Sequence, residues 1–164
     1  MGSLALLTDK QLKERPLDNA LTTDSLEKIM ADYVHFVPKE NDYGGYPAFG
    51  LGPYCMSKLA VNALTRVLQR DFNQDKSRED LSVNSCYPGY TVTGLTNQRG
   101  THTAEEAAKT SVYLALLGSR VQDANGFETD IPRGQLVRDR RVLDWVNSEG
   151  CMKFSDIPKF DAKT

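Results

Sequence analysis

The sequence predicts an α/β fold, and three segments carry that prediction. A long segment from Tyr54 to about Lys76 has apolar residues every three or four positions, which indicates a helix packed on a sheet. Leu81–Tyr87 is short, apolar in part and followed by Pro88, so it reads as a buried strand. A second helix after Thr103 and a second short strand at 135–137 repeat this order, as parallel sheets require.

Composition and charge exclude several classes of protein. The 164 residues are 40% hydrophobic and 26% charged, which is ordinary for a globular domain. A net charge of −2 argues against nucleic acid as the main partner. No apolar run is long enough for a membrane span, and the start lacks the pattern of a signal peptide. Three cysteines form neither a disulfide framework nor a metal-ligand spacing, so we expect free thiols, no metal and a cytoplasmic location.

The chain before the long helix is polar and prone to form helices. Short helices are expected at 9–14 and 23–33, the second capped by Thr23 or Asp24 with Glu27 in its first turn. One apolar stripe on the second helix predicts a packing face: Leu26, Ile29, Met30 and Tyr33. The glycine-rich stretch 43–53 does not continue as a phosphate-binding loop, so it is interpreted as a loop that leads into the long helix.

Tyr54 and Lys58 are the candidate catalytic residues. They lie four positions apart, so their side chains are neighbours on a helix. A phenol is a poor acid at neutral pH, but a nearby ammonium and the positive end of a helix both favour the phenolate. The pair can therefore act as a proton donor or acceptor. The alternative is a tyrosine ring that packs at the helix start while Lys58 extends to water.

The later part of the chain alternates helix, loop and strand. Thr103 and Glu106 form a capping box that opens a helix running to about Leu117 and ending near Gly118. Its small and apolar residues are expected to pack on a sheet: Ala107, Ala108, Ser111, Val112, Leu114 and Ala115. The stretch 118–133 is loop-like, with a turn at Asn125-Gly126. Arginines at 138, 140 and 141 are interpreted as a solvated rim, with a phosphate contact as the alternative. Trp145 is interpreted as a packing anchor and 150–164 as a loose tail.

The order Tyr-x-x-x-Lys on a helix, then a strand ending in Pro88-Gly89 with Thr93 beyond it, resembles the short-chain dehydrogenase/reductase family. The resemblance is closer to its monomeric carbonyl reductases, which carry a long insert before the tyrosine and a late strand like Gly134-Gln135-Leu136-Val137. It extends from about Leu4 to Trp145 but corresponds only to the second half of a family member.

The resemblance implies a doubly wound, Rossmann-like parallel sheet of which this chain is the C-terminal part. It divides a single partial domain into a helical insert at 4–42, a catalytic helix, strand and following helix at 54–117, a last strand and C-terminal segment at 118–150, and a tail at 151–164. The Gly-rich, pyrophosphate-binding half is absent. The catalytic serine is expected just upstream of Met1, since Ser3 alone lies near that position.

The resemblance also implies a reaction and a site. NADPH would reduce a small ketone or aldehyde to an alcohol, with Tyr54 as proton donor and Lys58 also bonding the ribose hydroxyls. Residues expected to contact the cofactor are Pro88, Gly89, Thr91, Val92 and Thr93, and those expected near the substrate are Tyr46, Phe49, Tyr90 and Leu95. The full-length protein would be a monomer, while the isolated chain is expected to be inactive. The alternative function is that of a truncated isoform or pseudoenzyme that binds another chain through its exposed edge and helix faces.

Overall fold

Strand β1 (Ser85–Cys86) pairs in parallel with β4 (Leu136–Arg138), which confirms the α/β fold with its parallel pairing. The structure is a computed structural model that describes residues 2–36, 42–47, 52–78, 80–118, 120–122 and 125–147. Strand β5 (Arg141–Leu143) adds an antiparallel partner to β4, giving the order β1-β4-β5. The sheet is therefore mixed, and its antiparallel strand was not predicted.

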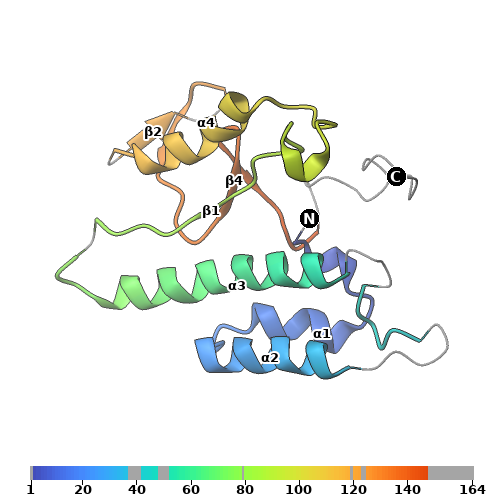
Figure 1. Cartoon of the computed structure of the whole chain (residues 1–164). Coiled ribbons are helices and arrows are strands. Elements are labelled where there is room, and N and C mark those ends of the chain that lie inside the picture. Colours follow the sequence, from blue (N-terminus) through green and yellow to red (C-terminus); the bar gives the residue numbers. More distant parts are fainter. Residues whose placement is uncertain are drawn as a thin grey trace.

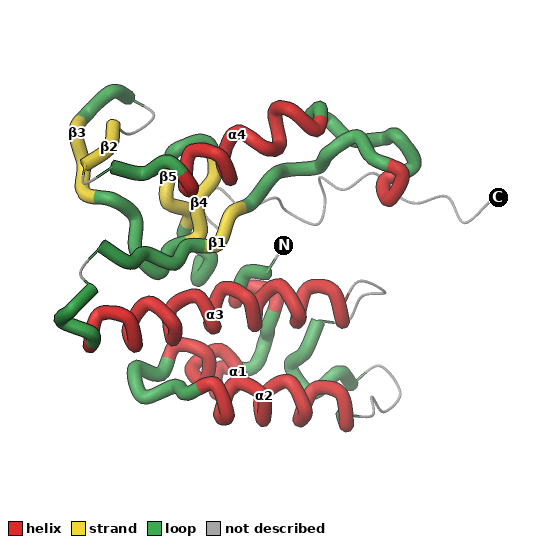
Figure 2. The backbone as a smooth tube through the Cα atoms, turned by 60° about the vertical axis from the view of Figure 1, so that its left-hand side comes forward, coloured by secondary structure: helices red, strands yellow, loops and turns green. Residues whose placement is uncertain are grey.

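The helix that carries Tyr54 and Lys58 is α3 (Gly52–Gln74), and it lies between two layers. Figure 1 places the small sheet on one side of α3 and the shorter helices α1 (Lys10–Glu14) and α2 (Thr23–His35) on the other. Helix α4 (Ala104–Ala115) lies beyond the sheet, as the turned view in Figure 2 also shows. Because α3 is covered on two sides, its buried residues include Leu59 and Val67 but also the polar Gln69.

Gln69 is a polar residue of α3 that is only 4% exposed. Its Oε1 accepts a hydrogen bond from the Val83 backbone N–H at 2.7 Å, and its Nε2 donates to Asn73 at 2.8 Å. Val83 itself lies before β1, so the strand is shorter than the predicted range 81–87. The buried amide thus fixes the segment that leads into β1.

The two short helices before α3 form much as predicted, with small shifts at the caps. Asp9 caps α1 by accepting from the Leu12 N–H at 2.9 Å. The cap of α2 is Thr22, in a reciprocal capping box with Ser25, so the predicted caps at Thr23 and Asp24 were wrong by one or two positions. The expected packing stripe is confirmed: Leu26 and Ile29 are buried, and Met30 and Tyr33 pack against the same core.

Two predictions for the later part of the chain were wrong. The stretch 118–133 is not a plain loop, because β2 (Arg120–Gln122) pairs antiparallel with β3 (Glu128–Asp130). The predicted turn at Asn125-Gly126 does lie between these strands, where Gly126 has a φ of 85°. Helix α4 ends at Ala115, with Leu116 rather than Gly118 at its end.

The predicted sheet-packing face of α4 is largely exposed. Among its described residues only Thr110 is buried, and the Thr110 hydroxyl accepts a hydrogen bond from the Asp139 N–H at 3.1 Å. Val112 is 53% exposed and Leu116 78% exposed. The pattern of small and apolar residues was read correctly, but within the described residues this face has little to pack against.

Other residues of the C-terminal region are placed as follows. Trp145 is buried, and its carbonyl accepts from the Leu4 N–H at 2.9 Å, so it anchors the chain start as a packing residue. Arg140 and Arg141 are exposed, but Arg138 is half-buried and does not belong to a solvated rim. The predicted tail at 150–164 lies outside the described residues. No described helix combines the length and the apolar character that crossing a bilayer requires.

Candidate active site

Tyr54 and Lys58 lie on neighbouring turns at the start of α3, and both side chains are exposed. The Lys58 Nζ is 5.4 Å from the centre of the Tyr54 ring, so the ammonium sits over the aromatic face. Tyr54 is 45% exposed. This proximity is what four-residue spacing on a helix produces, and among the described residues both side chains remain exposed.

The backbone beneath Lys58 is held by the first residues of the chain. Gly2 has a φ of 88°, and a Cβ built there would lie 2.9 Å from the Lys58 carbonyl carbon and oxygen. The Gly2 carbonyl accepts a hydrogen bond at 3.0 Å from Asn62, one turn beyond Lys58. Only a glycine at this position allows the chain to approach α3 so closely.

Ser3 is buried and serves locally. Its Oγ accepts from the Ala5 N–H at 3.1 Å and caps the short 3₁₀ turn Leu4–Leu6. This contact describes a capping residue, and the prediction that the catalytic serine precedes Met1 stays a prediction.

The predicted cofactor-binding segment follows the carboxyl end of β1, where ligands of open parallel sheets bind. Gly89 adopts a φ of 82°, and a short 3₁₀ turn at Gly94–Thr96 closes the segment. The Thr96 hydroxyl donates to the Thr91 carbonyl at 2.7 Å and accepts from the Thr93 N–H at 3.0 Å. The segment is therefore an ordered turn rather than an extended strand end.

The residues present fit the nicotinamide and ribose end of a dinucleotide. Within the described residues, Lys58 makes no ion pair and the Thr91 hydroxyl makes no hydrogen bond, so both remain able to bond a ligand. Three predicted cofactor residues, Pro88, Val92 and Thr93, are exposed or half-buried. A pyrophosphate-binding Gly-rich turn is not in the sequence, so only this end of the cofactor is accounted for.

The predicted substrate residues fall in different surroundings. Leu95 is 91% exposed, and Tyr90 is half-buried with its hydroxyl enclosed. Tyr46 is buried among aromatic rings, with ring centres of Tyr33 and Phe36 at 5.1 and 5.2 Å. Burial raises the pKa of Tyr46 above that of an ordinary tyrosine, so this phenol is a weaker acid than a solvated tyrosine. Phe49 lies outside the described residues.

Two residues near the segment were not singled out as site residues by the sequence. His102 and Arg138 meet behind Gly89, with the His102 Nε2 and the Arg138 Nη2 3.3 Å apart. They are 36 positions apart, so no local spacing could reveal them. In the sequence, Arg138 could have been found because it lies at the carboxyl end of the last predicted strand, where ligands of open α/β sheets bind. No cluster of His, Cys, Asp or Glu in the described part of the chain could hold a metal ion.

The chain is similar in sequence to several known proteins. Residues 41–104 match the family described as short chain dehydrogenase. The chain is 34% identical over 137 residues to carbonyl reductase (NADPH) 3 from Rattus norvegicus, covering 83% of this chain and 46% of the relative. It is 31% identical over 136 residues to carbonyl reductase (NADPH) 1 from Mus musculus, covering 82% and 45%.

A solved structure is similar as well. Salutaridine reductase from Papaver somniferum superposes with a TM-score of 0.60 at 29% identity, covering 82% of this chain and 41% of that one. The chain spans about half the length of the curated relatives it matches.

Proposed function

Because the chain belongs to the short-chain dehydrogenase family, we propose that it supplies the catalytic half of a reductase that converts ketones or aldehydes to alcohols. The observation that carries this proposal is the adjacency of Tyr54 and Lys58 at the exposed start of α3. NADPH, when bound, supplies the hydride that the carbonyl carbon receives. The names of the relatives support the choice of NADPH.

In this proposal Tyr54 gives its phenolic proton to the carbonyl oxygen as hydride reaches the carbon. Lys58 stabilises the phenolate that remains, because an ammonium close to an anion favours the charged form. Lys58 also bonds the ribose hydroxyls, and the segment Pro88–Thr93 holds the nicotinamide end. Tyr90 and Leu95, together with Tyr46 and Phe49, are proposed to border a small carbonyl substrate.

We propose further that the full-length protein is a cytoplasmic monomer. The support for the monomer is that α2 covers the face of α3 that lies away from the sheet (Figure 1). The support for the compartment is that the two described cysteines, Cys55 and Cys86, are free thiols, as is usual in a reducing environment.

The test is NADPH consumption by the purified chain mixed and refolded with the Gly-rich first half of a related carbonyl reductase. Replacing Tyr54 with Phe keeps the ring but removes the proton, so turnover should fall by about 10²–10⁴-fold. Tyr43→Phe is the matched control, because Tyr43 is also a partly exposed tyrosine but lies off the catalytic helix. Near-normal turnover by Tyr54→Phe would overturn the assignment.

Lys58→Met tests the second role. It should weaken NADPH binding and lower turnover, because the phenolate that forms on Tyr54 loses its nearby positive charge. Unchanged NADPH binding and turnover would mean that Lys58 merely extends to water, as in the packing alternative.

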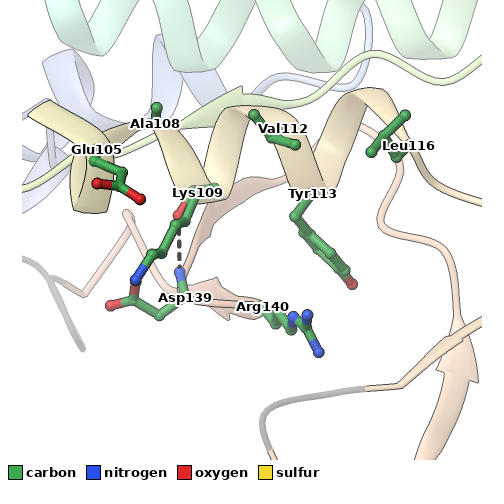
Figure 3. Close-up of a pocket in the computed structure, with 9 residues that line it drawn as sticks. Glu105, Ala108, Lys109, Val112, Tyr113, Leu116, Asp139 and Arg140 are labelled. Carbon is green, nitrogen blue, oxygen red and sulfur yellow. Dashed lines mark hydrogen bonds between the residues drawn. The ribbon is translucent and has the colours of Figure 1, made fainter.

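A second candidate function is supported by the exposed groove along α4. The groove has a volume of about 780 Å³, and Figure 3 shows side chains from α4 together with Asp139 and Arg140 along it. Ala108, Val112 and Leu116 recur every four residues as an exposed apolar stripe, and such a stripe normally packs against another element. On this alternative, the chain is a non-catalytic interaction module.

The occupant we propose for the groove is a polypeptide that carries the Gly-rich first half of the same fold. The support is that the chain spans about half of its relatives and that β1 lies at an edge of its sheet. Parallel strands are normally buried on both faces and continue into further strands. Val112→Glu should therefore weaken association with such a half, measured by calorimetry, whereas Val34→Glu on the exposed side of α2 should not. Association without turnover would favour the interaction module over the enzyme.

A further inference from the structure

The backbone of the proposed cofactor segment is held by the two residues that precede α4. The Tyr90 carbonyl accepts hydrogen bonds from the N–H groups of Thr101 and His102, at 2.6 and 3.1 Å. The Val92 N–H in turn donates to the His102 carbonyl at 2.8 Å. These bonds make a short parallel bridge that fixes residues 90–92 to residues 101–102.

The contacts of the His102 ring define which nitrogen carries the proton. The Thr101 hydroxyl donates its own proton to the Tyr90 carbonyl at 3.2 Å, so its oxygen is left to accept from the His102 Nδ1 at 2.9 Å. With the proton on Nδ1, the neutral ring presents a lone pair at Nε2. Arg138 Nη2 lies 3.3 Å from that atom and is always a donor. One neutral tautomer therefore satisfies all three contacts.

Arg138 is itself held in position from two sides. Its guanidinium carbon lies 5.0 Å from the centre of the Tyr87 ring, and its Nε donates to Asp139 at 3.1 Å. Its side chain is 23% exposed. Since Tyr87 follows β1 directly and Arg138 ends β4, the arginine links both parallel strands to His102.

The turn at Gly89 packs directly on this pair. A Cβ built on Gly89 would lie 3.2 Å from the His102 Nδ1 and 3.5 Å from the Arg138 Nη2. The φ of 82° at Gly89 also disfavours any side chain. Movement of either side chain would therefore displace the turn at Pro88-Gly89 as well as residues 90–92.

We propose that Arg138 and His102 are positioning residues for the cofactor segment, and that neutral His102 holds the segment in place while protonated His102 releases it. The reference to a cofactor rests on the function proposed above, whereas the contact itself does not. Protonation at Nε2 removes the acceptor and sets two cations against each other. The contact should therefore be weaker at acidic pH, where an imidazole takes up a proton, than at neutral pH.

Other charges near His102 act on the same equilibrium. Glu106 on α4 is the acidic group that interacts with His102, and its carboxylate is already bonded to the Thr103 N–H at 2.8 Å. Asp139, in the turn after β4, neutralises part of the charge of Arg138.

The experiment is amide hydrogen exchange on the purified chain, followed by NMR at pH values on either side of the imidazole titration. After correction for intrinsic rates, the amides of Val92, Thr101 and His102 should lose about tenfold or more of their protection at the acidic pH, while amides of α3 keep theirs. Arg138→Met should show the loss at both pH values. Arg138→Lys should restore only part of the protection, because a lysine lacks the planar fork.

His102→Gln decides the role of the titration, because glutamine keeps an acceptor but does not titrate. This variant should retain protection and lose its pH dependence, and Arg140→Met should behave as the unchanged chain. If Arg138→Met also lost protection throughout α3, the unfolding would be global, and the pH series on the unchanged chain and on His102→Gln would decide. Equal protection at both pH values, or an unaltered pH dependence in His102→Gln, would overturn the proposal. All of these experiments measure amide protection and none measures NADPH turnover. A failure of the proposed reductase function would therefore be distinguished from a failure of this proposal.

Discussion

The side-chain amide of Asn62 joins three parts of the chain, and its removal is expected to be costly. Asn62 is 5% exposed on α3, one turn beyond Lys58. Its Nδ2 donates to the Gly2 carbonyl at 3.0 Å, and its Oδ1 accepts from the Ser85 hydroxyl on β1 at 2.9 Å. We predict that Asn62→Ala destabilises the chain and loosens the start of α3.

The magnitude follows from the two hydrogen bonds. Leaving the buried Gly2 carbonyl unsatisfied costs about 1–3 kcal/mol, and the bond to Ser85 contributes about 1 kcal/mol. The sum is about 2–4 kcal/mol, a large part of the roughly 5–15 kcal/mol by which a small domain is stable. The Ser85 hydroxyl also has a longer contact to the Gln135 carbonyl at 3.5 Å. Because this contact can satisfy the hydroxyl after Asn62 is removed, we expect a cost toward the lower end of the 2–4 kcal/mol range, at about 2 kcal/mol.

The assay is urea unfolding followed by circular dichroism on a double-mutant cycle of Asn62→Ala and Ser85→Ala. The two substitutions should couple by about 0.5–1.5 kcal/mol, because they remove the same bond. Ser57→Ala is the matched control, since its exposed hydroxyl donates only to the Tyr54 carbonyl of its own helix, at 2.7 Å. A cost below about 0.5 kcal/mol for Asn62→Ala, or equal coupling to Ser57, would refute the reasoning.

The remaining predictions concern packing, capping, pH and thiol reactivity. Leu59→Ala should lower the free energy of unfolding by about 2–5 kcal/mol in the same urea assay, because Leu59 is 2% exposed in the core. Thr103→Ala should cost about 0.5–2 kcal/mol, since the Thr103 hydroxyl caps α4. Hydrogen bonds from Thr103 hold the pKa of Glu106 below its ordinary value of 4.5, so this stabilisation is present above that pH and is lost as the pH falls through the lowered pKa. Glu106→Gln should therefore flatten the acid side of a stability–pH curve. Burial raises the pKa of the Cys55 thiol, so mass spectrometry should find alkylation at exposed Cys86 first and at Cys55 only on unfolding.

These predictions can be checked against control substitutions or contradicting outcomes in the same chain. Val61→Ala, at a half-exposed position two residues from Leu59, should cost much less, and an equal cost would contradict the packing argument. Glu105→Gln tests whether the acid effect belongs to the capping bond of Glu106 or to the helix end in general. Rapid alkylation of Cys55 in the folded chain would show that the start of α3 opens readily.

Sequence periodicity predicted α3 well because the helix is long and its buried stripe is regular. Its first residues were missed since Gly52 and Pro53 were read as loop, although proline is tolerated in a first helical turn. The buried polar residues Asn62 and Gln69 could not be predicted, because their partners are backbone groups at Gly2 and Val83. A polar side chain off an apolar face looks the same in sequence whether solvent or a distant backbone group satisfies it.

The short strands were missed for a different reason. Strands β2, β3 and β5 have three residues each, too few for an alternating pattern to emerge. The turn between β4 and β5 consists of Asp139 and Arg140 at φ values of 50° and 62°, where Asn-Gly would have been the recognisable signal. The arginines at this turn were therefore read as a solvated rim, although Arg138 packs on Tyr87.

The candidate site has a catalytic part, Tyr54 and Lys58 on α3, and a cofactor-binding part, and this chain alone supplies the first more fully than the second. Helix α3 is held by α2 on one side and by the sheet on the other, and the four-residue spacing on this helix makes Tyr54 and Lys58 neighbours without any other chain. The face of α4 has no comparable cover among the described residues, and the sequence holds no Gly-rich turn for a pyrophosphate. On the proposed function, a dinucleotide would gain much of its binding from such a turn, so cofactor affinity should limit the isolated chain more than Tyr54 and Lys58 do. A polypeptide that supplies the turn is then expected to raise turnover without any change at Tyr54 or Lys58.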